Sequence, residues 1–215
     1  TVPSVPRHNI LGTTYGWNDS SIEVLLDASV DKLRIRHVRM ADETCKTGYE
    51  DHLEISGKIG PDSTAAVERL LPQMSRCIDI KSGKAIANAV YLSSGGGYLS
   101  DGYRLGKLFR ESQVTTYVTG EQECSSSCAI AFLGGKFRKM KYDGMLMFHA
   151  PYIGNGFAID CSDRGQVSGL KSYYNSMLGT KDGEFLLKRT LGYCSVNSGW
   201  TLNADGAKLF GITTN

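Results

Sequence analysis

The sequence lacks several features that would narrow its function at once. No apolar run approaches the ~20 residues that a membrane-spanning helix needs, so we expect no membrane span. The 215 residues carry a formal net charge of only +2, and the basic residues are scattered. This charge gives no reason to expect a nucleic acid or an acidic membrane surface as a partner. The densest basic stretch, residues 136–141 (KFRKMK), is interpreted as a solvated turn.

The sequence also lacks a Cys-x-x-Cys pair and has only four histidines, which argues against a zinc site. We therefore expect no metal and no cofactor. The six cysteines are an even number and favour disulfides in an oxidising compartment, periplasmic or extracellular, with six reduced cysteines in a cytosolic protein as the alternative. The start at Thr1 without a methionine suggests a processed or trimmed N-terminus. Sequence proximity alone favours the pairs Cys124–Cys128, Cys45–Cys77 and Cys161–Cys194.

A serine cluster between two cysteines is the stretch in which we expect a nucleophile, if the chain has one. Residues 124–128 read CSSSC and run directly into an apolar segment that ends at Gly135. Small residues allow a tight turn, and the first N–H groups of a following helix would be unpaired and able to stabilise an oxyanion. The structural alternative is a serine that only caps the helix.

The hydrophobic pattern predicts strands and helices in alternation. Strands are expected at residues 32–40, 53–60, 86–92, 114–118 and 145–148, and helices at 61–71, 99–109, 167–177 and 182–191, in the apolar segment after the serine cluster and within 202–212. Alternation of this kind implies parallel strands joined by right-handed crossovers. The length fits one large domain or two small ones. We divide the chain into an N-terminal arm or extension with a possible strand (1–50) and a main domain (51–215).

Three separated motifs resemble those of the Clp-type serine peptidases and their periplasmic relatives, within the ClpP/crotonase fold. Residues 91–102 (YLSSGGGYLSDG) resemble the family's strand, its N-S-P-G-G turn and the start of the next helix, residues 124–135 its nucleophile turn, and residues 147–151 (MFHAP) its M-I-H-Q-P motif. The resemblance spans roughly residues 52–212. It implies an α/β fold of repeated ββα units with a mainly parallel sheet and a helical C-terminal third.

The same resemblance implies a catalytic arrangement. It places Ser127 at the nucleophile and His149 at the general base, and it assigns the oxyanion hole to the backbone N–H groups of Gly97 and Cys128. The implied reaction is acyl transfer to water on a peptide or protein substrate. A homo-oligomer is expected because this fold commonly assembles. The first fifty residues lack an obvious counterpart of the segment by which Clp subunits engage an ATPase, so nothing indicates an ATPase partner.

One departure from the family concerns the acid of the triad. Its aspartate should lie a few residues before Leu202, where residues 195–200 read SVNSGW and contain no carboxylate. Asn197 is the expected orienter of the imidazole, with Ser198 beside it, and Asp160 and Asp163 are alternatives on the loop after the histidine. A neutral orienter stabilises an imidazolium less than a carboxylate does.

The sequence therefore favours a Clp-like serine peptidase or hydrolase of an oxidising compartment, without deciding whether it is an active enzyme. The missing aspartate supports a second hypothesis, a catalytically inactive ClpP-like binding or scaffold protein. A third, a crotonase acting on an acyl-CoA thioester, uses the same fold, but the serine and histidine motifs argue against it.

Overall fold

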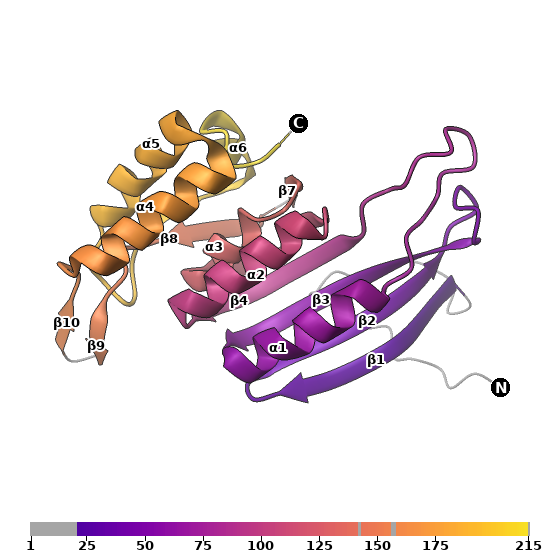
Figure 1. Cartoon of the computed structure of the whole chain (residues 1–215), viewed down its shortest axis with the longest axis horizontal. Coiled ribbons are helices and arrows are strands. Elements are labelled where there is room, and N and C mark those ends of the chain that lie inside the picture. The colour runs from indigo at the N-terminus through magenta and orange to yellow at the C-terminus, as the bar shows by residue number, and fades with distance from the viewer. Residues whose placement is uncertain (1–20, 142, 156–157, 215) are drawn as a thin grey trace.

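A mainly parallel sheet of nine strands forms the centre of the molecule. The computed structural model describes residues 21–141, 143–155 and 158–214. The strands of the sheet are β1 (Ile22–Val30), β2 (Leu33–Ala41), β3 (Tyr49–Ile59), β4 (Ala89–Gly97), β5 (Thr115–Thr119), β6 (Glu123–Ser125), β7 (Phe137–Lys141), β8 (Met145–Phe148) and β11 (Trp200–Leu202). They follow the order β1-β2-β3-β4-β6-β8-β11, with β5 paired to β4 and β7 paired to β5 (Figure 1). Strands β3 to β8 pair in parallel, whereas β1, β2 and β11 pair antiparallel with their neighbours.

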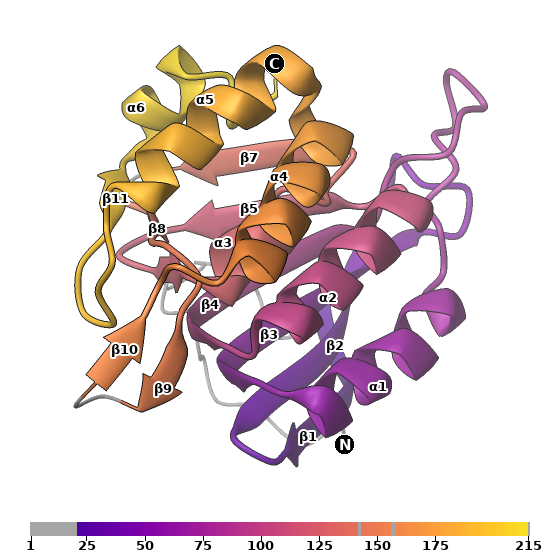
Figure 2. The same ribbon diagram turned by 60° about the vertical axis from the view of Figure 1, so that its left-hand side comes forward.

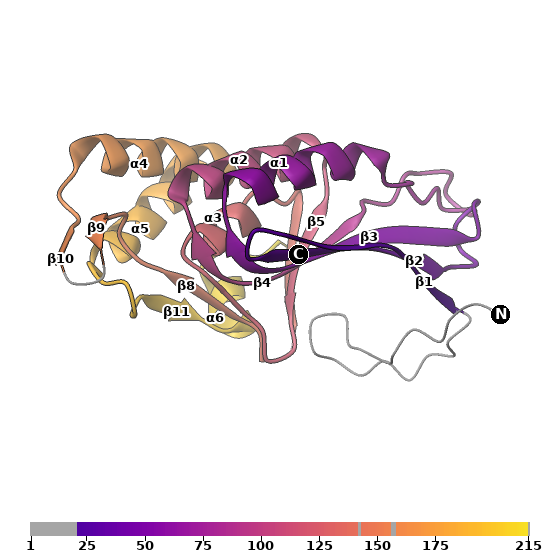
Figure 3. The same cartoon turned by 90° about the horizontal axis from the view of Figure 1, so that it is seen from below.

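Helices pack against this sheet, some of them side by side along one face (Figures 2 and 3). They are α1 (Pro61–Leu70), followed by the 3₁₀ turn Leu71–Gln73, α2 (Leu99–Glu111), α3 (Ser127–Phe132), α4 (Arg164–Leu178), α5 (Thr180–Leu191) and α6 (Ala204–Leu209). Helices α1, α2 and α4 lie side by side along that face (Figures 2 and 3). Leu105 and Phe109, four residues apart on α2, are fully buried with Leu53 and Ile55 of β3 in one core. The helical period of α2 and the alternation of β3 thus each direct apolar side chains into this core.

The expected fold class and most of the expected elements are confirmed. The predicted strands correspond to β2, β3, β4, β5 and β8, and each predicted helix has a counterpart. The nine-residue strand β1 escaped prediction, although apolar residues alternate along it from Ile22 to Val30. Short elements escaped as well, among them β6, β11 and the separate hairpin of β9 (Ile153–Asn155) and β10 (Ala158–Asp160). Three residues are too few to show a clear period of two.

The basic stretch at residues 136–141 is not the solvated turn that its composition suggested. Residues Phe137–Lys141 form β7, which pairs in parallel with β5. Arg138 is buried, and its Nε donates a hydrogen bond to the carbonyl of Ile212 at 2.6 Å. Burial, with the nearby charge of Arg110, lowers the pKa of Arg138 to about 10. This arginine therefore holds the end of the chain against the sheet.

The boundary expected at residue 50 falls at the start of β3. The preceding strands β1 and β2 form a hairpin that continues the same sheet, since β2 pairs with β3 from Leu33 opposite Gly57 to Ala41 opposite Tyr49. The first twenty residues of the expected arm lie outside the described residues. The division into two units stays a prediction.

The structure contains the three disulfides that sequence proximity favoured: Cys45–Cys77, Cys124–Cys128 and Cys161–Cys194. The first joins the turn after β2 to the segment that follows α1. The second spans the serine cluster, and the third joins the end of the β9–β10 hairpin to the segment after α5. Within the described part of the chain, no helix is long and apolar enough to cross a membrane.

Candidate active site

The three motifs meet where neighbouring parallel strands end. Ser94 of β4 pairs with Cys124 of β6, and Ser125 of β6 pairs with Met147 of β8. The glycine turn, Gly95–Gly97, forms the end of β4, the serine cluster spans the end of β6 and the start of α3, and His149 follows directly after β8. Because the carboxyl ends of parallel strands lie at one edge of a sheet, residues far apart in the sequence gather there.

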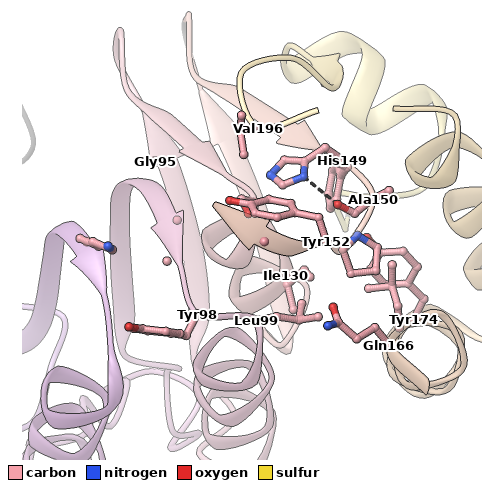
Figure 4. A pocket seen from close by; sticks show the side chains of 18 of the residues that line it. Gly95, Tyr98, Leu99, Ile130, His149, Ala150, Tyr152, Gln166, Tyr174 and Val196 are labelled. Carbon is pink, nitrogen blue, oxygen red and sulfur yellow. Dashed lines mark hydrogen bonds between the residues drawn. The ribbon is translucent and has the colours of Figure 1, made fainter. Parts of the chain in front are cut away.

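A cleft of about 680 Å³ opens at this edge (Figure 4). Gly95–Gly97, Ser126 and His149 line it, and Ile130 and Leu170 contribute to its apolar wall. The described residues that line the cleft include no carboxylate. Lys58 supplies the only permanent charge of that lining. The cleft thus combines an apolar wall with a few polar groups, which is the usual composition of a ligand site.

Ser126 occupies a sharp turn between β6 and α3. Its backbone has φ +57° and ψ −125°, an uncommon conformation for a residue other than glycine. The N–H of Ser126 donates to the carbonyl of Met147 at 2.9 Å, and its own carbonyl accepts from the N–H of Ile130 at 3.1 Å. Both bonds hold the strained turn in place. A strained strand-to-helix turn of this kind presents the serine side chain at the edge of the sheet.

The glycine turn allows this close approach. Gly96 has φ +102°, and a Cβ atom built on it would lie 2.7 Å from the Cβ of Ser126 and 2.8 Å from the carbonyl oxygen of Ser125. Its N–H donates to the hydroxyl of Ser94 at 3.0 Å. Gly97, expected in the oxyanion hole, also lines the cleft, and a side chain there would overlap the carbonyl of Ile59. Only glycine fits at these two positions.

Ser127, the serine at the predicted nucleophile position, lies elsewhere. It is the first residue of α3 and is 1% exposed, and its Oγ has no hydrogen-bond partner among the described residues. It packs on α2, where a Cβ added to Gly102 would lie 2.9 Å from the Cβ of Ser127. The structure therefore brings Ser126, rather than Ser127, to the cleft that His149 lines. The sequence offers no signal for this register, because both serines are flanked by small residues.

The remaining residues of the cluster are buried. Ser125 donates a hydrogen bond to the carboxylate of Glu123. Cys128, whose N–H was expected in the oxyanion hole, is fully buried in the first turn of α3 and bonded to Cys124. The disulfide closes the turn around Ser126 from the side of the core.

His149 follows β8 and is partly buried at the cleft. Its Nδ1 lies 2.9 Å from the carbonyl oxygen of Ala150, and its ring stacks on Tyr152 at 5.8 Å between centroids (Figure 4). A carbonyl can only accept a hydrogen bond, so Nδ1 carries the proton and Nε2 of the neutral ring has the free lone pair. This tautomer is the one that a general base needs.

None of the expected orienting side chains contacts His149 in the described part of the chain. Asn197 is exposed, and its N–H donates to the hydroxyl of Ser195 at 3.2 Å. Asp160 accepts hydrogen bonds from the N–H and hydroxyl two residues further on, and Asp163 caps α4. The group that orients the imidazole is a main-chain carbonyl. Every residue except the last has a main-chain carbonyl of this kind, so the residue type at position 150 does not predict this role.

Comparison with known proteins assigns the fold. No protein-family model matches the sequence, and no curated protein matches it. A serine-to-alanine variant of the 1510-N membrane-bound stomatin-specific protease is similar with a TM-score of 0.58 and 14% identity, over 74% of this chain and 75% of that one. Another variant of that protease, in complex with a substrate peptide, has a TM-score of 0.57 and 15% identity, over 74% and 71% of the two chains. ClpP1 from Listeria monocytogenes has a TM-score of 0.50 and 15% identity, over 73% and 84%.

The fold that these neighbours share is the ClpP-like fold. This chain has that fold, with a mixed α/β architecture and a mainly parallel sheet. Identities of this size carry the architecture and leave the chemistry to be argued from the site.

Proposed function

We propose that this protein is a serine peptidase or peptidase-like hydrolase with Ser126 as nucleophile and His149 as general base. The observation that carries the proposal is the position of Ser126. It sits in a strained turn at the cleft that His149 also lines, and its N–H is bonded to β8 two residues before the histidine. The resemblance of the sequence motifs supports the same chemistry one residue away, at Ser127.

The proposed reaction is acyl transfer to water. Nε2 of His149 takes the proton of the Ser126 hydroxyl as Oγ attacks a carbonyl carbon, and the same imidazole then protonates the leaving group. The oxyanion is stabilised by the N–H of Gly97 and by the N–H that follows the nucleophile, which belongs to Ser127 once Ser126 attacks. Water then releases the acyl group by the same route. A general base contributes typically ~10²–10⁴ in rate and one oxyanion donor ~10²–10³.

The substrate class we propose is a peptide or protein with an apolar side chain near the scissile bond. Ile130 and Leu170 in the wall of the cleft support this choice. The substrate peptide bound to one structural neighbour supports it by analogy. Three disulfides support a periplasmic or secreted location, because such bonds persist in oxidising compartments.

A binding or scaffold protein without activity is the second candidate. The observation that favours it is the carbonyl of Ala150 where the family has a carboxylate, since a neutral acceptor stabilises the imidazolium less.

A fluorophosphonate probe tests the proposal, because it reacts only with an activated serine. We expect the wild-type chain and the Ser127→Ala variant to be labelled, and the Ser126→Ala variant not to be. Ser127→Ala removes a hydroxyl that has no hydrogen-bond partner among the described residues, so it should change the free energy of unfolding by no more than ~1 kcal/mol.

The result that would move the nucleophile to Ser127 is loss of labelling in Ser127→Ala with labelling retained in Ser126→Ala. Absence of labelling in a wild-type chain that circular dichroism shows to be folded would favour the scaffold.

A further inference from the structure

His149 is oriented by the backbone of a single residue. The carbonyl of Ala150 accepts from Nδ1 of His149, and the N–H of Ala150 donates to the carbonyl of Tyr193 at 2.9 Å. Ala150 is 1% exposed and lies after the end of β8. The bond to Tyr193 is therefore one contact that holds this stretch of backbone, and with it the imidazole, against the rest of the protein, next to the pairing of Phe148 with Trp200.

The segment that supplies this contact has no regular structure of its own. Tyr193 lies between α5, which ends at Leu191, and β11, which starts at Trp200. The residue is 38% exposed, and its N–H donates to the carbonyl of Thr190 in the last turn of α5 at 3.1 Å. The next residue, Cys194, is joined covalently to Cys161 at the end of the β9–β10 hairpin. A disulfide thus anchors the segment one residue from the carbonyl that Ala150 needs.

We propose that the Cys161–Cys194 disulfide is a positioning crosslink for His149. It holds the Tyr193 carbonyl in place, the carbonyl holds Ala150, and Ala150 orients the imidazole. Breaking the crosslink leaves the fold intact and lowers the rate at which Ser126 is activated. The catalytic half of this inference rests on the proposed function, whereas the positioning half concerns the backbone alone.

Solvent exposure sets this disulfide apart. Cys194 is exposed and Cys161 is half-buried. The cysteines of the other two disulfides are at most 2% exposed. Exchange with a dithiol requires access to a sulfur atom. A dithiol such as dithiothreitol should therefore open Cys161–Cys194 first, giving up two electrons and two protons to form two protein thiols while it becomes a cyclic disulfide.

The protein contains a matched control. Cys45–Cys77 spans 32 residues and Cys161–Cys194 spans 33, so loop closure in the unfolded chain makes nearly equal contributions for the two bonds. The segments that carry Cys45 and Cys77 lie at the end of the molecule opposite the β9–β10 hairpin (Figures 1 and 3). If a disulfide acts on the active site only through stability, removal of either bond should slow labelling. If Cys161–Cys194 positions His149, only removal of that bond should do so.

The experiment compares the double variants C161S/C194S and C45S/C77S with the wild-type chain. The first readout is the rate of fluorophosphonate labelling, well below the melting temperature of each protein. The second is hydrogen exchange of the Ala150 amide, which does not depend on activity. For C161S/C194S we expect labelling to slow by about tenfold or more, a part of what a general base contributes. We also expect faster exchange at Ala150. C45S/C77S should match the wild type in both.

A third measurement uses the wild-type chain and tests the inference even if a double variant fails to fold. The folded wild-type chain is treated with increasing dithiothreitol, and alkylation followed by mass spectrometry identifies the thiols formed. Labelling should slow in step with opening of Cys161–Cys194, before the other disulfides open.

Two results would overturn the inference. The first is labelling and Ala150 exchange that keep their wild-type rates after the crosslink is broken. The second is an equal loss of labelling rate in both double variants. If the wild-type chain does not react with the probe, the proposed function fails, and exchange at Ala150 alone decides whether the crosslink positions this backbone.

Discussion

Ser125, Ser126 and Ser127 carry the same hydroxyl group in three different environments. The first donates to Glu123, the second lines the cleft, and the third is buried without a hydrogen-bond partner among the described residues. The difference arises from the end of β6 and the start of α3, which leave one residue between them for the turn. The positive φ of that residue aims its side chain out of the sheet.

The absence of a Cβ atom at Gly96 should be essential to this arrangement. In Gly96→Ala the new Cβ would lie 2.7 Å from the Cβ of Ser126, at a φ that side chains rarely adopt. We expect fluorophosphonate labelling to fall by about tenfold or more, because a displacement of ~1 Å at a reacting group can cost ~10²-fold.

Gly95→Ala is the matched control for that prediction. A Cβ at Gly95 would meet no atom within 4 Å. This variant should lose much less labelling. Equal losses in the two variants would show that the close approach at Gly96 is not what matters.

At the scale of elements, β2 and β3 are joined by buried charge as well as by apolar packing. Asp51 is 1% exposed and accepts from Nε of Arg39 at 2.7 Å and from the N–H of Ser75 at 2.9 Å. Burial alone would raise the pKa of Asp51, but the bonds from Arg39, Ser75 and His37 outweigh it and lower the pKa. Asp51 therefore ties the segment after α1 to the sheet in its ionised form.

Asp51→Asn should destabilise the protein in a way that depends on pH. A carboxyl group with a lowered pKa in the folded state stabilises fully above the pKa of the unfolded chain, about 3.9, and this contribution is lost as the pH falls through the folded value. We expect the free energy of unfolding to fall by about 2 kcal/mol at pH 7, which is typical of a charge-assisted hydrogen bond. The difference in this free energy between the variant and the wild type should shrink below about pH 4.

Urea unfolding at pH 7 and pH 3 measures this effect. Asp27→Asn is the control, because Asp27 and Arg34 form a similar ion pair with exposed side chains, and such pairs contribute little. A difference between wild type and Asp51→Asn that is the same at both pH values would contradict the assignment.

At the scale of the whole molecule, the sheet ends in an edge strand, β1. Leu25 and Leu26 are each 39% exposed there, beside an irregularity in the pairing of β1 with β2. Exposed apolar edge strands favour association, and irregular pairing limits it. The edge gives a physical reason to test assembly, which the sequence resemblance also implies.

We predict a homo-oligomer in solution. Light scattering after size exclusion should give a mass that is a multiple of 23.4 kDa, and the melting temperature should rise with protein concentration. A single species of 23.4 kDa at every concentration would contradict this prediction.

The sequence by itself determined most of the elements whose pattern is long enough to repeat, although the alternation of β1 was missed. The alternation in residues 53–60 and the helical period in 99–109 predicted β3 and α2, and three separated motifs indicated the fold class. The disulfide pairs also followed from proximity along the chain. For the helices and strands the signal is local, because it depends on neighbouring residues.

Only the tertiary structure decided which groups meet. It placed Ser126 instead of Ser127 at the cleft, because the register of a turn depends on where β6 pairs and where α3 starts. It also placed the Ala150 carbonyl, held by Tyr193, where the sequence led us to look for a side chain. Backbone groups are the same at almost every position, so their roles are set by packing in three dimensions and leave no mark in the order of residues.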